Sequence, residues 1–168
     1  KFSNKIYQTS GGLHGVGSSV VNALSEFMNV EVSRDGNIYS QKYSRGIPQT
    51  KLEIIGKTKA RGTKITFKPD AEIFGENNIF KPLRLYRMIR SKAFLFKGVK
   101  INWKCDESLL PQDGNVPAEA VLCFPNGIKD YLAETIKTRP QVVSNIFYTE
   151  SNLASDMGKV EVAMSWIA

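Results

Sequence analysis

The sequence is poor in the residue types from which metal sites and disulfide frameworks are built. Its 168 residues include one histidine, His14, and two cysteines, Cys105 and Cys123. One histidine cannot build a metal site from imidazoles, and the two cysteines lack the Cys-x-x-Cys spacing of a zinc or redox motif. No apolar run approaches the length that spans a bilayer. We therefore expect two buried, reduced thiols, as in a cytoplasmic protein, and no membrane partner.

Positive charge, by contrast, is in surplus. The chain has 23 lysines and arginines against 16 acidic residues, for a net charge of +7. Such a surplus suits an acidic partner, such as a nucleotide or a nucleic acid, although many basic proteins bind neither. Charged residues make up 23% of the chain and hydrophobic residues 42%, which is the ordinary balance of a globular domain with a core.

A glycine-rich stretch runs from Ser10 to Gly17 and reads Ser-Gly-Gly-Leu-His-Gly-Val-Gly. Glycines let backbone N–H groups approach a phosphate closely, and a helix that follows adds further unpaired N–H groups. By composition the stretch is either an anion-binding loop or a flexible one. It is not a Walker A loop, because no Gly-Lys-Ser/Thr follows. It is also not a dinucleotide-binding fingerprint, because no strand leads into it.

The residues after this loop predict a buried helix and then a β-hairpin. Apolar residues from Val16 to Met28 recur at helical spacing and cover more than half of the helix surface. Alternating residues on both sides of Asp35 and Gly36 predict two strands joined by a tight turn, because Asp-Gly supplies the positive φ angles that such a turn needs.

The rest of the chain mixes helices and strands. Hairpins outnumber βαβ units, which favours an α+β class with a layered sandwich. We expect a domain boundary near residue 140, with domains over 1–140 and 141–168 and the second domain cut short. Helices are predicted over 79–96 and 126–136, and strands over 52–57, 62–67, 99–105, 119–124, 146–148 and 160–166.

Two polar features each allow two interpretations. Thr63 has the parity of Ile65 and Phe67 on its strand, so its hydroxyl faces the apolar side and needs a partner. That partner is either a backbone carbonyl or a ligand. The helix predicted over 79–96 has basic residues along one side, which form either a nucleic-acid-facing stripe or a solvated surface. These residues are Arg84, Arg87, Arg90 and Lys92.

The exact string of the glycine loop resembles a known nucleotide-lid motif. Gly-Gly-Leu-His-Gly-Val-Gly, followed by Ser-Val-Val-Asn-Ala-Leu-Ser, is similar to the ATP lid of the B subunits of bacterial DNA gyrase and topoisomerase IV. The resemblance continues in order through residues 62–70, 130–134 and 160–166, so it covers nearly the whole chain. The strings Asp-Tyr-Leu-Ala-Glu and Arg-Ser-Lys-Ala resemble topoisomerase IV more than gyrase.

This resemblance implies a fold and an activity. The fold would be that of the GHKL (Bergerat) ATPases, a two-layer α/β sandwich with a mixed, mostly antiparallel sheet, followed by the first strand of a transducer domain. The activity would be that of an ATP-dependent type II DNA topoisomerase, a known antibiotic target, with ATP and Mg²⁺ as cofactors. The partners would be a topoisomerase A subunit of the topoisomerase IV or gyrase type, double-stranded DNA, and a second copy of the ATPase subunit that associates when ATP binds.

The resemblance also implies roles for individual residues. Thr63 would help to hold the adenine, and Arg34, Thr63 and Ile65 would form the pocket that binds aminocoumarin inhibitors. Without the family, Arg34 is equally well explained as a surface charge at the hairpin tip. Lys1 and Tyr7 would lie in the lid, with Lys1 near a phosphate. Without the family, Lys1 is equally well explained as a solvated terminal lysine. The residues that would wrap the triphosphate are Gly12, Leu13, His14, Gly15, Val16, Gly17 and Ser18.

Several functional groups of the family have no match in this chain. The family's general base is a glutamate, an asparagine on the same helix binds Mg²⁺, and an Asp-x-Gly-x-Gly motif reads the adenine amino group. We expect these groups upstream and therefore assign no catalytic residue and no metal ligand within the chain. In this family His14 would shape the lid and not act as the base. We expect the 168-residue chain alone neither to hydrolyse ATP nor to bind it tightly.

Three other functions stay open at this point. The first is a gyrase ATPase subunit, which would support supercoiling and not decatenation. The second is another GHKL ATPase, such as a mismatch-repair protein or a chaperone, but the Ser-Val-Val-Asn-Ala-Leu-Ser continuation disfavours it. The third is a non-catalytic basic module that binds nucleic acid through the arginine-bearing helix. Salt-dependent DNA binding without any nucleotide effect would favour that module.

Overall fold

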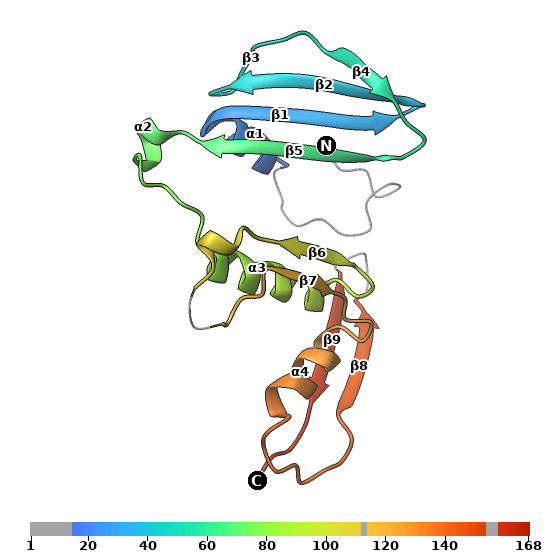
Figure 1. Cartoon of the computed structure of the whole chain (residues 1–168). Coiled ribbons are helices and arrows are strands. Elements are labelled where there is room, and N and C mark those ends of the chain that lie inside the picture. The colour runs from blue at the N-terminus through green and yellow to red at the C-terminus, as the bar shows by residue number, and fades with distance from the viewer. Residues whose placement is uncertain (1–14, 112–113, 154–157) are drawn as a thin grey trace. The chain divides into compact units, whose positions relative to one another are not determined.

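The computed structural model describes residues 15–111, 114–153 and 158–168. The chain forms two compact units, the first ending at Ile79 and the second beginning at Phe80. Each unit has its own sheets and helices (Figure 1). Residues on both sides of position 140 belong to the second unit. The division into functional domains over 1–140 and 141–168 stays a prediction.

The first unit is an antiparallel sheet with a short helix against it (Figure 1). The strand order is β3-β2-β1-β5, and β4 also pairs with β2. Helix α1 contacts β1 and β2. The elements of this unit are α1 (Gly17–Ala23), β1 (Ser25–Arg34), β2 (Asn37–Ser44), β3 (Ile47–Pro48), β4 (Glu53–Lys57), β5 (Gly62–Pro69) and the single-turn α2 (Ala71–Phe74).

The predicted β1–β2 hairpin is confirmed. Arg34 pairs with Asn37 at its tip, and the two strands run antiparallel from there. Asp35 and Gly36 take the left-handed backbone conformation, with φ angles of 52° and 80°. The Asp-Gly pair therefore closes this turn as the sequence predicted.

The predicted long buried helix is wrong in both length and burial. Helix α1 ends at Ala23, and the chain continues as strand β1, which buries Met28 to 4% exposure within the sheet. On α1 itself Val20 is 48% exposed. The spacing of the apolar residues after Leu24 is compatible with a helix and with a strand. These residues form a strand because β2 and β5 pair with them on both sides. The Ser25 hydroxyl donates to the carbonyl of Val21 at 2.6 Å and closes the last turn of α1.

The end of the first unit's sheet is held by a buried carboxylate. Asp70 is 2% exposed and caps α2 by accepting a hydrogen bond from the backbone N–H of Glu72 at 3.0 Å. The Arg45 guanidinium donates to both Asp70 oxygens, at 2.6 and 3.2 Å, and also pairs with Glu72 at 2.6 Å. This contact ties the β2–β3 turn to the end of β5.

The second unit is built around helix α3, which contacts β6 and α4. Pro82 occupies the first turn of α3, as predicted, because its fixed φ suits that position. Strands β6 and β7 pair, and β8 pairs with β9. The elements are α3 (Pro82–Leu95), β6 (Ile101–Lys104), the 3₁₀ turn η1 (Glu107–Leu109), β7 (Glu119–Leu122), α4 (Ile128–Ile136), β8 (Phe147–Asn152) and β9 (Lys159–Met164).

An aromatic stack forms the centre of the second unit. Phe94 on α3 is 4% exposed and stacks on Phe124, with ring centroids 3.6 Å apart. Tyr131 on α4 meets the Phe94 ring edge-on at 5.3 Å. Because these rings come from α3, the segment after β7, and α4, the stack joins three parts of the unit.

The end of α3 is also tied to the β8–β9 pair. The Lys97 ammonium bonds to the hydroxyl of Tyr148 and lies 2.6 Å from a carboxylate oxygen of Glu150. Lys159 pairs with Glu150 and Glu161 on the same strands, at 2.9 and 3.0 Å. Within the described residues, no helix is both long and apolar enough to cross a membrane. Cys105 and Cys123 are free thiols.

Candidate functional site

The two faces of the first unit's sheet differ sharply in chemistry. One face presents Met28, Val30 and Val32 of β1 beside Ile65 and Thr63 of β5, as the strand register requires. The other face is polar. It has the Lys64–Glu31 and Lys68–Glu26 ion pairs at 3.4 and 2.5 Å, and a Ser40–Asn29 hydrogen bond at 3.0 Å. The apolar face is therefore the one that can receive a ligand or another layer of the fold.

Helix α1 and the apolar face enclose a hollow of about 270 Å³. Its rim is polar on the helix side and apolar on the sheet side. The side-chain oxygen of Asn22 is buried, and it has no hydrogen-bond partner among the described residues. A buried oxygen without a partner is costly, so this atom is suited to accept a hydrogen bond from a bound group. The hollow is lined by Ser18, Ser19, Asn22, Met28, Val30, Tyr43 and Ile65.

The predicted orientation of Thr63 is confirmed. Thr63 pairs with Val32, and Ile65 pairs with Val30, so both β5 residues lie on the apolar face. Thr63 is exposed, and within the described residues its hydroxyl has no hydrogen-bond partner. Among the described residues, therefore, no backbone carbonyl accepts a hydrogen bond from the Thr63 hydroxyl. The role of Thr63 in adenine binding stays a prediction.

Arg34 lies at the end of β1 on the same face of the sheet as Val32. Its side chain is 66% exposed and pairs with the adjacent Asp35 at 3.0 Å. This placement suits a hairpin-tip surface charge, and it equally leaves the guanidinium accessible at the rim of the apolar face. Its predicted role in an inhibitor pocket with Thr63 and Ile65 is not decided by this geometry and stays a prediction.

The predicted phosphate loop lies only partly within the described residues. Its last four residues are described: Gly15 has a φ of 64°, Val16 precedes α1, and Gly17 and Ser18 begin the helix. The left-handed angle at Gly15 favours glycine there. No side chain caps the first turn of α1 in the described part of the chain. The loop residues that fall outside the described ranges are Lys1, Tyr7, Gly12, Leu13 and His14.

Two arginines of the predicted basic stripe on α3 have different surroundings. Arg90 pairs with Glu134 of α4, and its guanidinium lies 5.5 Å from the centre of the Phe94 ring. Arg87 is exposed and has no ion pair among the described residues. The helix therefore carries one arginine that is held in place and another that is open to a partner.

Sequence reasoning missed the ion pair between Arg45 and the buried Asp70 in the first unit. The Arg45 guanidinium holds the pKa of the Asp70 carboxyl below its usual value, while burial opposes that shift. The Asp-Ala-Glu string before a helical turn is a capping signal that could have pointed to Asp70. Its partner could not be read from the string, because Arg45 is 25 positions away. The cluster closes the end of the sheet, and none of its three residues lines the hollow.

Similarity to known proteins extends over almost the entire chain. The chain is 51% identical to the B subunit of DNA topoisomerase 4 from Bartonella bacilliformis over 167 residues, which is 99% of this chain and 24% of that protein. It is 49% identical to the same subunit from Caulobacter vibrioides, over 99% of this chain and 24% of that protein. Almost the whole chain is therefore similar to one segment of the B subunits of bacterial type II DNA topoisomerases. No protein-family model matches it.

A solved gyrase B structure shares the fold of this chain. The crystal structure of the 43K ATPase domain of Thermus thermophilus gyrase B, in complex with an aminocoumarin, matches with a TM-score of 0.72 and 31% identity. The match covers 84% of this chain and 37% of that structure. The predicted α+β sandwich of the GHKL ATPases is thereby confirmed. The chain spans about a quarter of the length of the curated topoisomerase subunits that it matches.

Proposed function

We propose that this chain is part of the ATPase region of a type II topoisomerase, in which ATP binding and hydrolysis drive subunit dimerisation and DNA strand passage. The observation that carries the proposal is the 51% identity to the B subunit of a topoisomerase 4 across 99% of the chain. The solved gyrase B ATPase domain with the same fold supports it. The partners are a topoisomerase A subunit, double-stranded DNA and a second copy of the ATPase subunit, and the site of action is the cytoplasm.

The hollow under α1 fits the adenine end of ATP. A flat base needs apolar walls and hydrogen-bonding groups at its edge. Val30 and Ile65 supply such walls. The Asn22 oxygen on α1 lines the hollow, and the Thr63 hydroxyl is on the apolar face two residues along β5 from Ile65; neither has a partner among the described residues. In our proposal Thr63 holds the adenine.

The triphosphate takes the other end of this site. Backbone N–H groups of the loop from Gly12 to Ser18 wrap the phosphates, because glycines let the backbone approach them closely. Lys1 and Tyr7 complete the lid, with the Lys1 ammonium beside a phosphate. Bound Mg²⁺ supplies charge neutralisation on the phosphates. Its protein ligand and the general base are assigned to no residue of this chain.

We extend this proposal to an inhibitor pocket. The gyrase B domain of similar fold was solved with an aminocoumarin. We infer that Arg34, Thr63 and Ile65 bind this inhibitor class here. Arg34 is at the open end of the apolar face, where an exposed guanidinium can meet a ligand that extends beyond the adenine position.

A pair of threonine variants on one strand tests the nucleotide site. In the full-length protein that contains this chain, Thr63→Val removes a hydroxyl from the apolar face. The matched control Thr66→Val makes the same change on the polar face of β5. Because an adenine group left without its partner costs a hydrogen bond, Thr63→Val should weaken ATP binding about tenfold. Isothermal titration with a non-hydrolysable ATP analogue measures this. Equal affinities for the two variants would remove Thr63 from the site.

We further propose topoisomerase IV-like activity, which unlinks and relaxes DNA, in preference to gyrase-type supercoiling. The curated relatives described above are named as B subunits of topoisomerase 4. The reconstituted enzyme should unlink catenated circles with ATP and should not introduce negative supercoils into relaxed plasmid. Efficient supercoiling would assign the chain to a gyrase. ATP turnover by the purified 168-residue chain alone would contradict the assignment of the general base to another part of the protein.

A further inference from the structure

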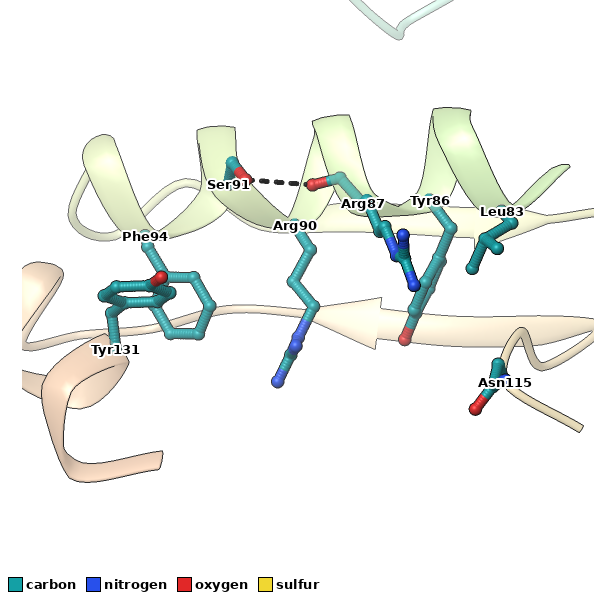
Figure 2. Close-up of a pocket in the computed structure, with 8 residues that line it drawn as sticks. All are labelled: Leu83, Tyr86, Arg87, Arg90, Ser91, Phe94, Asn115 and Tyr131. Carbon is teal, nitrogen blue, oxygen red and sulfur yellow. Dashed lines mark hydrogen bonds between the residues drawn. The ribbon is translucent and has the colours of Figure 1, made fainter. Parts of the chain in front are cut away.

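A second hollow lies along one side of helix α3 and belongs wholly to the second unit. Its volume is about 320 Å³. Figure 2 shows that its side chains come from α3, from the segment before β7 and from α4. We refer to it as the α3 hollow. Its lining residues are Leu83, Tyr86, Arg87, Arg90, Ser91, Phe94, Asn115 and Tyr131.

The helix beside this hollow has an unbalanced charge. From Pro82 to Leu95 it carries three arginines and a lysine, and it contains no aspartate or glutamate. Arg84, Arg87 and Arg90 follow one another at one-turn spacing. Like charges one turn apart destabilise a helix, while opposite charges at this spacing stabilise it. A ligand that neutralises these cations would therefore stabilise the helix.

Of these three arginines, Arg90 is the one whose side chain is held in place by contacts within the fold. Glu134 pairs with its guanidinium, and the Phe94 ring lies beneath it at 5.5 Å from the ring centre. Phe94 is itself locked by its stack on Phe124. These contacts place the Arg90 side chain before any ligand arrives, which lowers the entropy that binding must overcome.

Arg87 is the open member. Its side chain is exposed, and among the described residues its guanidinium meets neither a carboxylate nor a hydrogen-bond acceptor. In Figure 2 it points from α3 in the same general direction as Tyr86 and Arg90, and all three line the hollow. The Ser91 hydroxyl is occupied by a 3.0 Å hydrogen bond to the Arg87 carbonyl. The N–H donors of the Arg87 guanidinium are therefore free to bind a ligand, next to the Arg90 side chain that Glu134 already orients.

The chemistry of these walls fits a phosphodiester. A guanidinium matches two phosphate oxygens with parallel hydrogen bonds, and the aromatic rings of Tyr86 and Tyr131 offer apolar surface for an adjacent sugar. The chain's net charge of +7 favours approach of a polyanion. A carboxylate and a phosphodiester each carry one negative charge, but a nucleic-acid backbone places further phosphates within reach of the other cations of α3.

We propose that the α3 hollow binds a phosphodiester group of the DNA backbone, with Arg87 as the principal donor and Arg90 as the second. The choice of DNA as the source of the phosphate rests on the proposed function. The hollow is lined by second-unit residues, whereas the candidate nucleotide hollow is lined by first-unit residues, so no lining residue is shared.

The test measures DNA binding by the full-length protein that contains this chain, without nucleotide and without the A subunit. Fluorescence anisotropy of a labelled duplex is recorded between about 50 and 200 mM salt. Arg87→Gln should weaken binding about tenfold at the lowest salt and reduce the salt slope by about 1, because one phosphate contact is lost. Ser91→Asp should also weaken binding, because it places a carboxylate in the hollow and leaves both arginines intact.

Arg139→Gln is the matched control. It removes the same charge from an exposed arginine of the same unit that lies outside the hollow and has no ion pair among the described residues. Its salt slope should equal that of the parent protein. Equal slope changes for Arg87→Gln and Arg139→Gln would overturn the proposal, because they would show an effect of net charge alone. Circular dichroism melts show whether each variant is folded.

Two competitors distinguish the sources of the anion. Inorganic phosphate, added at constant ionic strength, should compete only weakly, because it lacks the sugar and the neighbouring phosphates. Full displacement of DNA at millimolar phosphate would assign the hollow to a free anion and overturn the choice of DNA. An Arg87→Gln protein that binds polyglutamate less well but DNA unchanged would assign the hollow to an acidic protein segment and would also overturn it.

ATP hydrolysis separates this proposal from the proposed function. In the absence of DNA, Arg87→Gln should hydrolyse ATP at the parent rate, because Arg87 lines no part of the hollow under α1. If the parent protein hydrolyses no ATP while Arg87→Gln still lowers the salt slope, the topoisomerase assignment fails and the α3 site stands. If hydrolysis is intact and the slope does not change, the α3 site fails alone.

Discussion

Arg45 in the first unit and Arg87 in the second show two opposite uses of the same side chain. The Arg45 guanidinium is fully engaged, since it bonds both oxygens of Asp70 and one of Glu72. Arg87 projects from a helix that contains no acidic residue, and no carboxylate among the described residues pairs with it. Removing Arg45 should therefore cost stability, whereas removing Arg87 should cost binding of a partner.

The same contrast holds for the two regions as a whole. The first unit has ion pairs on the polar face of its sheet and at the cap of α2, where Arg45 meets a buried carboxylate. The second unit is stabilised by an aromatic stack, and most of the cations on α3 are left without acidic partners among the described residues. Arg45, which two carboxylates neutralise, is structural, whereas Arg87, which the fold leaves open, is suited to a ligand.

The largest effect on stability should come from the aromatic stack. Phe94→Ala should lower the free energy of unfolding by about 3–5 kcal/mol, because it removes a nearly buried ring and leaves a cavity beside Phe124. Arg87→Gln on the same helix should change it by less than about 0.5 kcal/mol. Urea unfolding followed by circular dichroism measures both. Similar losses for the two variants would break the division between structural and binding residues on α3.

Arg45→Ala should have the next largest effect. It leaves the Asp70 carboxylate buried without its cation, so the midpoint of thermal unfolding should fall by about 10 °C. Arg61→Ala is the control, because Arg61 is exposed and has no ion pair among the described residues. Calorimetry of both proteins gives the comparison. A shift no larger than that of the control would show that Arg45 is as free as Arg87.

The pH dependence should be the smallest of these effects. Arg45 holds the pKa of Asp70 below the ordinary aspartate value of about 3.9, so the stabilisation is complete above that pH. It is lost as the pH falls through the lower pKa of the folded state. Asp70→Asn should therefore flatten the fall in stability below about pH 4. Acid titration followed by circular dichroism measures the slope, and an unchanged slope would mean that Asp70 is not paired in solution.

In the second unit, Glu150 is the carboxylate that corresponds to Asp70, because neighbouring groups also lower its pKa. Lys97, Lys159 and Tyr148 lower the pKa of Glu150 to about 2. Its side chain is about half exposed, so solvent screens these contacts. Glu150→Gln should accordingly reduce the fall in stability at acid pH less than Asp70→Asn does. A larger effect from Glu150 would place the main electrostatic contribution in the second unit and reverse the comparison.

Local signals predicted the parts of the fold that depend on neighbours in sequence. Asp35 and Gly36 predicted the hairpin because their backbone angles decide that turn. Pro82 marked the start of α3, and strand parity placed Thr63 on the apolar face. For the candidate site, the lid motif and the parity of Thr63 were readable from the sequence. The α3 hollow was visible only as a stripe of basic residues, with its partners unnamed.

Contacts between distant positions account for what the sequence did not predict. The helix predicted through Met28 stops at Ala23, because strands β2 and β5 pair with the residues that follow. The partners Arg90 and Glu134 are 44 positions apart, and no local pattern joins them. The burial of Asp70 likewise depends on a turn far away in the chain. These features are set by tertiary pairing, which overrides local propensity.

The assignment of the chain to an ATP-driven topoisomerase is tested most directly by strand passage. The full-length protein that contains this chain, combined with a topoisomerase A subunit, is incubated with catenated DNA circles with and without ATP, and the products are separated by gel electrophoresis. The account predicts free circles only when ATP is present, with much less product from Thr63→Val than from Thr66→Val at limiting ATP. Salt-dependent DNA binding without unlinking at any ATP concentration would contradict it.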